Sequence, residues 1–233
     1  MNGRPAAWQR RTCIWITAGV AAATLAYLAP GRAQSRPDLG YTTAVSERLV
    51  TAYAARFGPP ARGRLERWKA YARERKALPV RELELLVLVN NYLNQITFVD
   101  DLKHWGEIDY WATPAEAVAS NGADCEDYSI AKYFLLKELG VPVARLRLTY
   151  VKSLKLDQAH MILAYYAHPG AEPLVLDNLE QTVRSASQRP DLVPVYSFND
   201  DEVWIEARGR AGSPKQLRNW SSLLERLERE ART

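Results

Sequence analysis

The spacing of apolar residues divides the chain into a helical first half and a strand-rich second half. Apolar side chains recur at helical spacing over residues 45–56 and 65–76, with a glycine and two prolines between the two segments. A third helix is expected to open at Pro79 and to run to about Leu93. Residues 98–121 are aromatic, acidic and irregular, which predicts a loop that packs against its own side chains.

The segment GADCEDYSIAKYFLLKELGVP, residues 122–142, predicts a buried central helix. Apolar groups spread around a helix of about 14 residues, as expected for a helix covered on all sides. Gly140 ends this helix and Pro142 prevents its continuation. Cys125 falls in the first turn, between acidic neighbours.

After this helix the apolar period changes to two, which is typical of strands. The expected strands are Val143–Val151, His160–Ala167 and Leu174–Leu179, with an edge strand within Val195–Trp204. The connections are short, so an antiparallel sheet is expected. Pro214–Glu228 carries one apolar stripe and predicts an amphipathic closing helix. The pattern therefore predicts an α+β fold in which a cysteine-bearing helix packs on an antiparallel sheet.

The first 33 residues read as an export signal. Arg4, Arg10 and Arg11 precede the uncharged apolar run Ile14–Ala29, and small residues at Gly31 and Ala33 suit a signal peptidase. An uncleaved membrane anchor is the alternative interpretation, although the run is slightly short for a span.

The net charge of +4 comes entirely from this leader segment. It contains four arginines and no acidic residue, so the remaining 27 basic residues equal the 27 acidic residues of the chain. A balanced charge gives no support to a nucleic-acid partner.

Cys125 is the single cysteine that remains once Cys13 leaves with the signal. A lone exported thiol cannot form an internal disulfide, so it is either buried or retained for its chemistry. A helix N-terminus favours a thiolate, because unpaired N–H groups give it a partial positive charge.

His160 and Asp177 complete a candidate catalytic triad with Cys125. His160 opens a strand after the cysteine helix and is positioned to exchange the thiol proton. Asp177 lies on the next strand and is positioned to orient the imidazole. The other histidines, His104 and His168, lie in the acidic loop and beside a turn.

The segment DDLKHWGEIDYWATPAEAVASNGADCEDYSIAKYFLLKELG, followed by AHMILAYY and LVLDNL, resembles the bacterial transglutaminase-like cysteine proteinases, the LapG family. The resemblance extends from about Leu86 to Gly209. It implies a papain-like or transglutaminase-like fold and a Cys-His-Asp triad. Carried over to matching positions, it assigns Cys125 as nucleophile, His160 as general acid and base, and Asp177 as its orienter.

The resemblance also implies a dependence on Ca²⁺. Asp124, Glu126 and Asp127 would offer oxygen ligands beside the nucleophile, and Glu107 and Asp109 in the acidic loop are the nearest further supply. The alternative is an acidic helix N-terminus, because carboxylates are favourable in a first turn without any metal.

The family further implies an activity and partners. Its members are periplasmic, monomeric enzymes that cleave large surface adhesins near the N-terminal retention module, releasing the adhesin and dispersing a biofilm. They are restrained by an inner-membrane receptor that senses cyclic-di-GMP. Two other functions stay open: acyl transfer to an amine, which transglutaminases perform with the same triad, and a non-catalytic periplasmic binding module.

The expected organisation follows from these patterns. Residues 1–33 form the signal peptide, 34–44 a leader, 45–97 an N-terminal helical part, 98–209 the catalytic core and 210–233 the C-terminal helix, with 34–233 as one domain.

Overall fold

The computed structural model describes residues 41–206 and 209–233, so the expected signal peptide, residues 1–33, lies outside the described residues. The helices are α1 (Tyr41–Ala44), α2 (Glu47–Phe57), α3 (Pro60–Ala77), α4 (Glu82–Leu93), α5 (Asp101–His104), α6 (Pro114–Ser120), α7 (Cys125–Glu138) and α8 (Arg218–Ala231). Short 3-10 turns are η1 (Val143–Arg145), η2 (Ala186–Gln188) and η3 (Pro214–Gln216). Within the described ranges, no helix is long and apolar enough to cross a membrane.

The strands form one large antiparallel sheet and one small parallel pair. The large sheet has the order β6-β5-β4-β3-β7-β8-β9. Its strands are β3 (Leu146–Ser153), β4 (Gln158–Tyr165), β5 (Leu174–Leu176), β6 (Arg184–Ser185), β7 (Leu192–Phe198), β8 (Val203–Ile205) and β9 (Gly209–Gly212). The small pair joins β1 (Thr97–Phe98) to β2 (Gly122–Ala123), directly before α7. This pair fixes the chain at the point where the cysteine helix begins.

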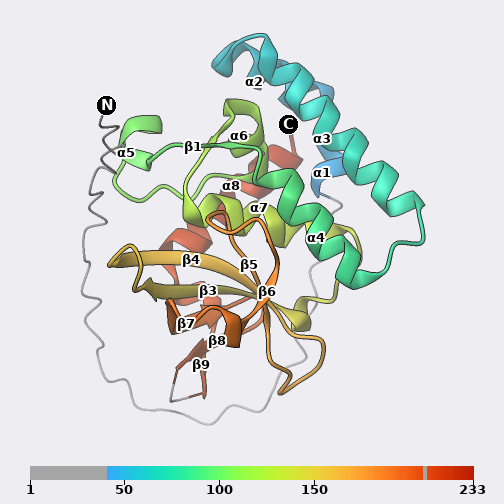
Figure 1. The fold of residues 1–233 in the computed structure, drawn as a ribbon. Helices are drawn as coiled ribbons and strands as arrows, with labels where there is room; N and C mark the ends of the chain where they lie inside the picture. The colour runs from blue at the N-terminus through green and yellow to red at the C-terminus, as the bar shows by residue number, and fades with distance from the viewer. Residues whose placement is uncertain (1–40, 207–208) are drawn as a thin grey trace, which may run out of the picture.

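Helix α7 is the centre of the molecule. It packs on β4 and β3 on one side and on α4 and α6 on others, and Figure 1 shows it between the sheet and the N-terminal helices. Ile130, Tyr133 and Leu135 are fully buried, in agreement with apolar groups all around the helix. The predicted α+β architecture, with a buried cysteine helix on an antiparallel sheet, is confirmed.

Helix α8 joins the core instead of lying on its surface. Trp220 is 1% exposed and stacks on Phe134 of α7 with 5.8 Å between ring centroids. Glu230 near its end is buried and accepts hydrogen bonds from the hydroxyl groups of Tyr41, Tyr53 and Thr113. The last helix is therefore tied to the first elements of the chain.

The predicted leader, residues 34–44, extends too far into the chain. Tyr41–Ala44 forms α1, and Tyr41 is buried against Trp68 and Phe134, with ring centroids 6.2 and 6.1 Å apart. An aromatic side chain of this size contributes substantially to a core. Residues 41–44 therefore belong to the packed core and not to a leader.

The expected edge strand within Val195–Trp204 is wrong in two respects. The segment forms two strands, β7 and β8, and β7 lies inside the sheet between β3 and β8. The side-chain Oδ1 of Asn199 accepts the backbone N–H groups of Asp201 and Glu202 at 2.9 and 3.0 Å, which turns the chain between the two strands. Such a local side-chain turn is the reason that one continuous strand does not form.

Candidate active site

Cys125 is the first residue of α7. Asp124 precedes it as the N-cap, and the carboxylate of Asp127 accepts the backbone N–H of Asp124 at 3.4 Å. These residues begin the helix here because their side chains satisfy backbone groups that have no partner within the helix. The sulfur therefore lies at the positive end of a buried helix.

The thiol lies against the peptide that joins His160 to Met161 in β4. Ser129 Oγ is 2.9 Å from the carbonyl oxygen of Cys125 and 3.1 Å from that of Met161, so it bridges the helix and the strand. The backbone N–H of Met161 lies close enough to the Cys125 sulfur to act against the rise in its pKa, although burial and the neighbouring carboxylates outweigh this effect. Helix and strand thereby bring the cysteine next to the backbone of the predicted histidine.

His160 and Asp177 form a buried pair. His160 Nε2 is 2.8 Å from Asp177 Oδ1, and the same oxygen accepts the backbone N–H of Leu179 at 3.0 Å. Asp177 Oδ2 forms an ion pair with Nη1 of Arg189 at 2.9 Å. Burial raises the pKa of Asp177, but the hydrogen bond from His160 and the charge of Arg189 outweigh it, so that the pKa falls below its usual range. Asp177 is thus held as a carboxylate, and Nδ1 is the imidazole nitrogen left for other partners.

The cysteine itself is held as a thiol. Its Sγ donates to Oε2 of Glu126 at 3.0 Å, and in the described part of the chain no hydrogen bond joins it to the imidazole. Burial raises the pKa of Cys125 well above its ordinary value, and the charges of Glu126 and Asp124 raise it further. A positive charge beside this sulfur would offset those carboxylates and lower the pKa of the thiol.

Five carboxylates converge beside the thiol and could hold a cation. One group consists of Asp101, Asp124 and Asp127, and a second consists of Asp101, Asp109 and Glu126; in each, one ligand oxygen per residue lies within 4.8 Å of the others. Burial raises the pKa of Asp101 to about 7, with Glu126 and the other acids adding to the effect. Burial and mutual repulsion also raise the pKa values of Asp124 and Asp127.

The donors of this acidic cluster fit a hard divalent cation. Asp101 Oδ1 and Asp124 Oδ1 are buried and have no hydrogen-bond partner among the described residues. Helix capping explains one oxygen of Asp127 but leaves both of these atoms unexplained. An all-oxygen set of anionic ligands is the chemistry that Ca²⁺ prefers. The cluster therefore favours a metal site over a merely acidic helix start.

The site differs from the sequence expectation at three residues. Glu107 was expected among the ligands, but it is exposed and belongs to neither group of converging carboxylates. Asp101 and Arg189 were not predicted. Asp101 is 3% exposed at the start of α5, and only the folding of the acidic loop onto α7 brings it to the cluster.

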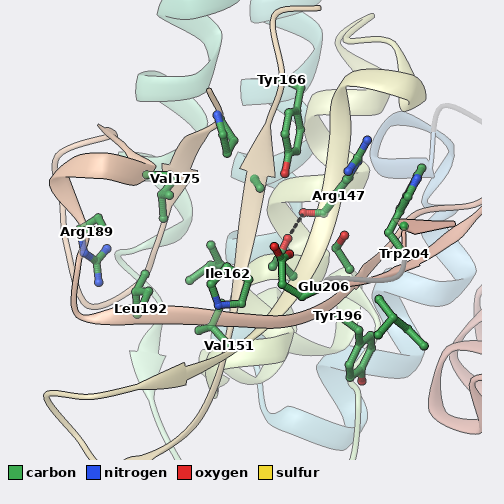
Figure 2. A pocket seen from close by; sticks show the side chains of 18 residues that line it. Arg147, Val151, Ile162, Tyr166, Val175, Arg189, Leu192, Tyr196, Trp204 and Glu206 are labelled. Atoms are coloured by element: carbon green, nitrogen blue, oxygen red, sulfur yellow. Dashed lines mark hydrogen bonds between the residues drawn. The ribbon is translucent and has the colours of Figure 1, made fainter. Parts of the chain in front are cut away.

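A separate pocket of about 250 Å³ lies on the sheet, and Figure 2 shows its lining. Arg147 lines it, with its guanidinium 3.9 Å from the ring centroid of Trp204 and 4.4 Å from that of Tyr166. Arg189 also lines this pocket, whereas Cys125, His160 and Asp177 do not. The pocket thus adjoins the site through Arg189 but does not contain the reactive groups.

A cysteine at a buried helix start, beside a His–Asp pair on an antiparallel sheet, is typical of the transglutaminase-like fold, and the comparisons identify the cysteine proteases of this fold as the class. The model of the family described as bacterial transglutaminase-like cysteine proteinase, BTLCP, matches residues 67–211. The chain belongs to this family, that of LapG, as its sequence predicted, and it is a cysteine protease.

Solved structures of Legionella pneumophila LapG are similar to this chain. One is 39% identical, covers 78% of this chain and 98% of its own, and has a TM-score of 0.67. An EGTA-treated form is 38% identical, with 78% and 98% covered and a TM-score of 0.69. A calcium-bound form is 40% identical, with 78% and 99% covered and a TM-score of 0.66. Among curated proteins, none matches.

Proposed function

We propose that this protein is a calcium-dependent cysteine endopeptidase that acts in the periplasm. Cys125 is the nucleophile, His160 the general acid and base, and Asp177 the residue that orients it. The observation that carries the proposal is the buried His160–Asp177 pair at 2.8 Å, with the Cys125 sulfur against the His160–Met161 peptide.

The reaction follows from this arrangement. The imidazole of His160 takes the thiol proton, and the sulfur attacks the peptide carbonyl to form a tetrahedral intermediate. Backbone N–H groups at the start of α7 supply donors for the oxyanion. His160 then protonates the leaving amine, and water, deprotonated by the same imidazole, releases the acyl group. Asp177 keeps the imidazole in one tautomer and stabilises its protonated form.

The acidic cluster supports a role for Ca²⁺. Asp101, Asp124, Asp127, Asp109 and Glu126 would hold the ion. When bound, it supplies positive charge that offsets the carboxylates around Cys125. The description of one LapG structure as calcium-bound and of another as EGTA-treated is consistent with this role.

The substrate and partners of the proposal come from the family. We expect cleavage of a large surface adhesin near its N-terminal retention module, with release of the adhesin and dispersal of a biofilm. An inner-membrane cyclic-di-GMP receptor would sequester the enzyme. Export to the periplasm rests on the signal-like pattern of residues 1–33.

The test is cleavage of the N-terminal region of an adhesin from the same genome. We expect wild type to cleave it, chelator to abolish cleavage and Ca²⁺ to restore it. Cys125→Ala should be inactive yet unfold at the same temperature, and Asp177→Asn should lose about 10³- to 10⁴-fold in kcat. Full activity in excess chelator would remove the metal role and leave the triad. Amine incorporation in place of hydrolysis would identify an acyltransferase.

A further inference from the structure

Asp177 lies just beyond the sheet, in the connection from β5 to β6. The pairing of β5 with β4 ends at Leu176, opposite Leu163, one residue before Asp177. The connection that follows leaves Leu179 47% exposed, so apolar burial holds it only weakly at this point. The position of the Asp177 carboxylate therefore depends on hydrogen bonds.

Two asparagines of α4 supply hydrogen bonds to this connection. Nδ2 of Asn94 donates to the backbone carbonyl oxygen of Asp177 at 2.9 Å. Nδ2 of Asn90 donates to the backbone carbonyl oxygen of Gln181 at 3.0 Å. The two asparagines are four residues apart, so their side chains project from the same face of the helix. The connection is thus tied to α4 at residues 177 and 181.

The hydrogen bond from Asn94 acts on the residue that orients the imidazole. Oδ1 of Asp177 accepts the backbone N–H of Leu179 at 3.0 Å, which fixes the carboxylate relative to its own backbone. Asn94 in turn fixes that backbone relative to α4. With both bonds in place, Oδ1 of Asp177 lies 2.8 Å from Nε2 of His160. An unbroken series of contacts therefore connects α4 to the imidazole.

We propose that Asn94 is a positioning residue of this protease, whose amide group holds Asp177 where its carboxylate meets His160. The inference rests on the proposed roles of Cys125, His160 and Asp177. Helix α4 also packs on α7, so the amide fixes the carboxylate to the same framework that carries the nucleophile.

The proton on Nε2 of His160 tests the proposal without any substrate. In a Cys125→Ala background with Ca²⁺ present, ¹H NMR detects this proton far downfield while the Asp177 carboxylate accepts it, and His160→Gln assigns the signal among the three histidines. Asn94→Leu preserves the size of the side chain and removes the donor. We expect the resonance to move upfield and its exchange with water to accelerate about tenfold or more. Asn94→Ala should behave in the same way, and it replaces Asn94→Leu if the leucine prevents folding.

Turnover of the adhesin fragment gives the second measurement, with Cys125 present. Asn94→Leu should lower kcat by about 10- to 100-fold, because the dyad loses its alignment. KM should stay near the wild-type value, because the amide acts through Asp177. Asn94→Gln should recover part of the loss in kcat, since the longer side chain retains an amide donor.

Asn90→Ala and Asn91→Leu are the matched controls. Asn90 is 0% exposed and its hydrogen bond reaches Gln181, so Asn90→Ala should lower the thermal unfolding temperature and change kcat less than Asn94→Leu does. Asn91 is exposed on the same helix, so Asn91→Leu should leave the resonance, kcat and stability unchanged.

A folded Asn94→Leu with the wild-type resonance and kcat would overturn the proposal. Equal effects of Asn90→Ala and Asn94→Leu on the resonance would also overturn it, because any loosening of the connection would then be sufficient. A shifted resonance in Asn94→Leu, when the wild type cleaves no adhesin fragment, would instead uphold the positioning role and reject the proposed substrate.

Discussion

Oδ1 of Asp177 accepts a hydrogen bond from Nε2 of His160, and Oδ2 of the same carboxylate forms an ion pair with Arg189. All three side chains are no more than 9% exposed. The two oxygens have different partners, so the carboxylate cannot rotate without losing one of them. Arg189 therefore contributes to the geometry of the candidate triad without approaching the sulfur.

Arg189→Gln should move acid unfolding to higher pH. The folded-state pKa of Asp177 is below its unfolded value, so its stabilisation is present above that unfolded value and is lost as pH falls through the folded one. Without the charge of Arg189, the effect of burial is opposed less, and the pKa of Asp177 in the folded state rises. We expect a loss of about 3 kcal/mol at pH 7, as for a broken buried pair.

Urea unfolding between pH 3 and pH 7 measures this shift. Arg184→Gln is the control, because Arg184 pairs with Glu180 at 3.3 Å in a largely exposed position. It should change stability by less than about 0.5 kcal/mol. Identical pH dependence in Arg189→Gln and wild type would contradict the electrostatic role of Arg189.

Asp101→Asn should weaken calcium binding much more than Glu107→Gln. Asp101 belongs to both groups of converging carboxylates, whereas Glu107 belongs to neither. In wild type, Ca²⁺ at about 100 times its Kd should stabilise the protein by about 2.7 kcal/mol. Titration calorimetry with Ca²⁺ measures the affinities, and equal losses in the two variants would place the site elsewhere.

Arg226→Met should loosen the acidic cluster from a distance. Arg226 on α8 donates to the carbonyl oxygen of Trp111, while the neighbouring N–H groups of Tyr110 and Ala112 donate to Asp101 at 2.5 Å and Asp127 at 2.7 Å. Residues 110–112 are thus held by α8 on one side and by the acidic cluster on the other. We expect a loss of about 1–3 kcal/mol in stability and weaker Ca²⁺ binding.

Arg229→Met is the comparison for this variant, since Arg229 is exposed on the same helix. It should leave the Ca²⁺ affinity measured by calorimetry unchanged. If Arg226→Met loses stability but retains full Ca²⁺ affinity, α8 only completes the core and does not position the ligands.

Gly122→Ala should destabilise the start of α7. A Cβ at this position would lie 2.5 Å from Cε1 and 2.6 Å from Nε2 of His104, whose ring is also held 2.9 Å from Ser120 Oγ. Overpacking of this kind costs about 1–3 kcal/mol. Thermal unfolding of Gly122→Ala and of the double variant with His104→Ala tests the contact. If the second change recovers no stability, the ring is not the obstacle.

The sequence predicted the parts of this fold that depend on local pattern. The central helix, its end before Gly140 and the strand that carries His160 follow from apolar periodicity and helix-ending residues. The order of β7 within the sheet does not, because strand neighbours depend on tertiary pairing. The turn at Asn199 lies within an otherwise strand-like run and divides it.

The candidate site shows the same limit. Cys125, His160 and Asp177 are distinguished by residue type and by their positions at element ends, and the fold brings two of them into direct contact. Asp101 and Arg189 are ordinary charged residues in sequence. Their importance comes from burial beside other charges, which no spacing along the chain reveals.

The hydrogen bond from Tyr41 to Glu230 has a consequence for how the molecule folds. This bond closes nearly the whole described chain into one loop, and contacts between residues so far apart in sequence cost chain entropy and form slowly. Helix α8 must therefore leave the ribosome before the native core can be completed. Until that moment the polypeptide stays incompletely folded, which is the condition in which a chain can still be threaded through a narrow channel.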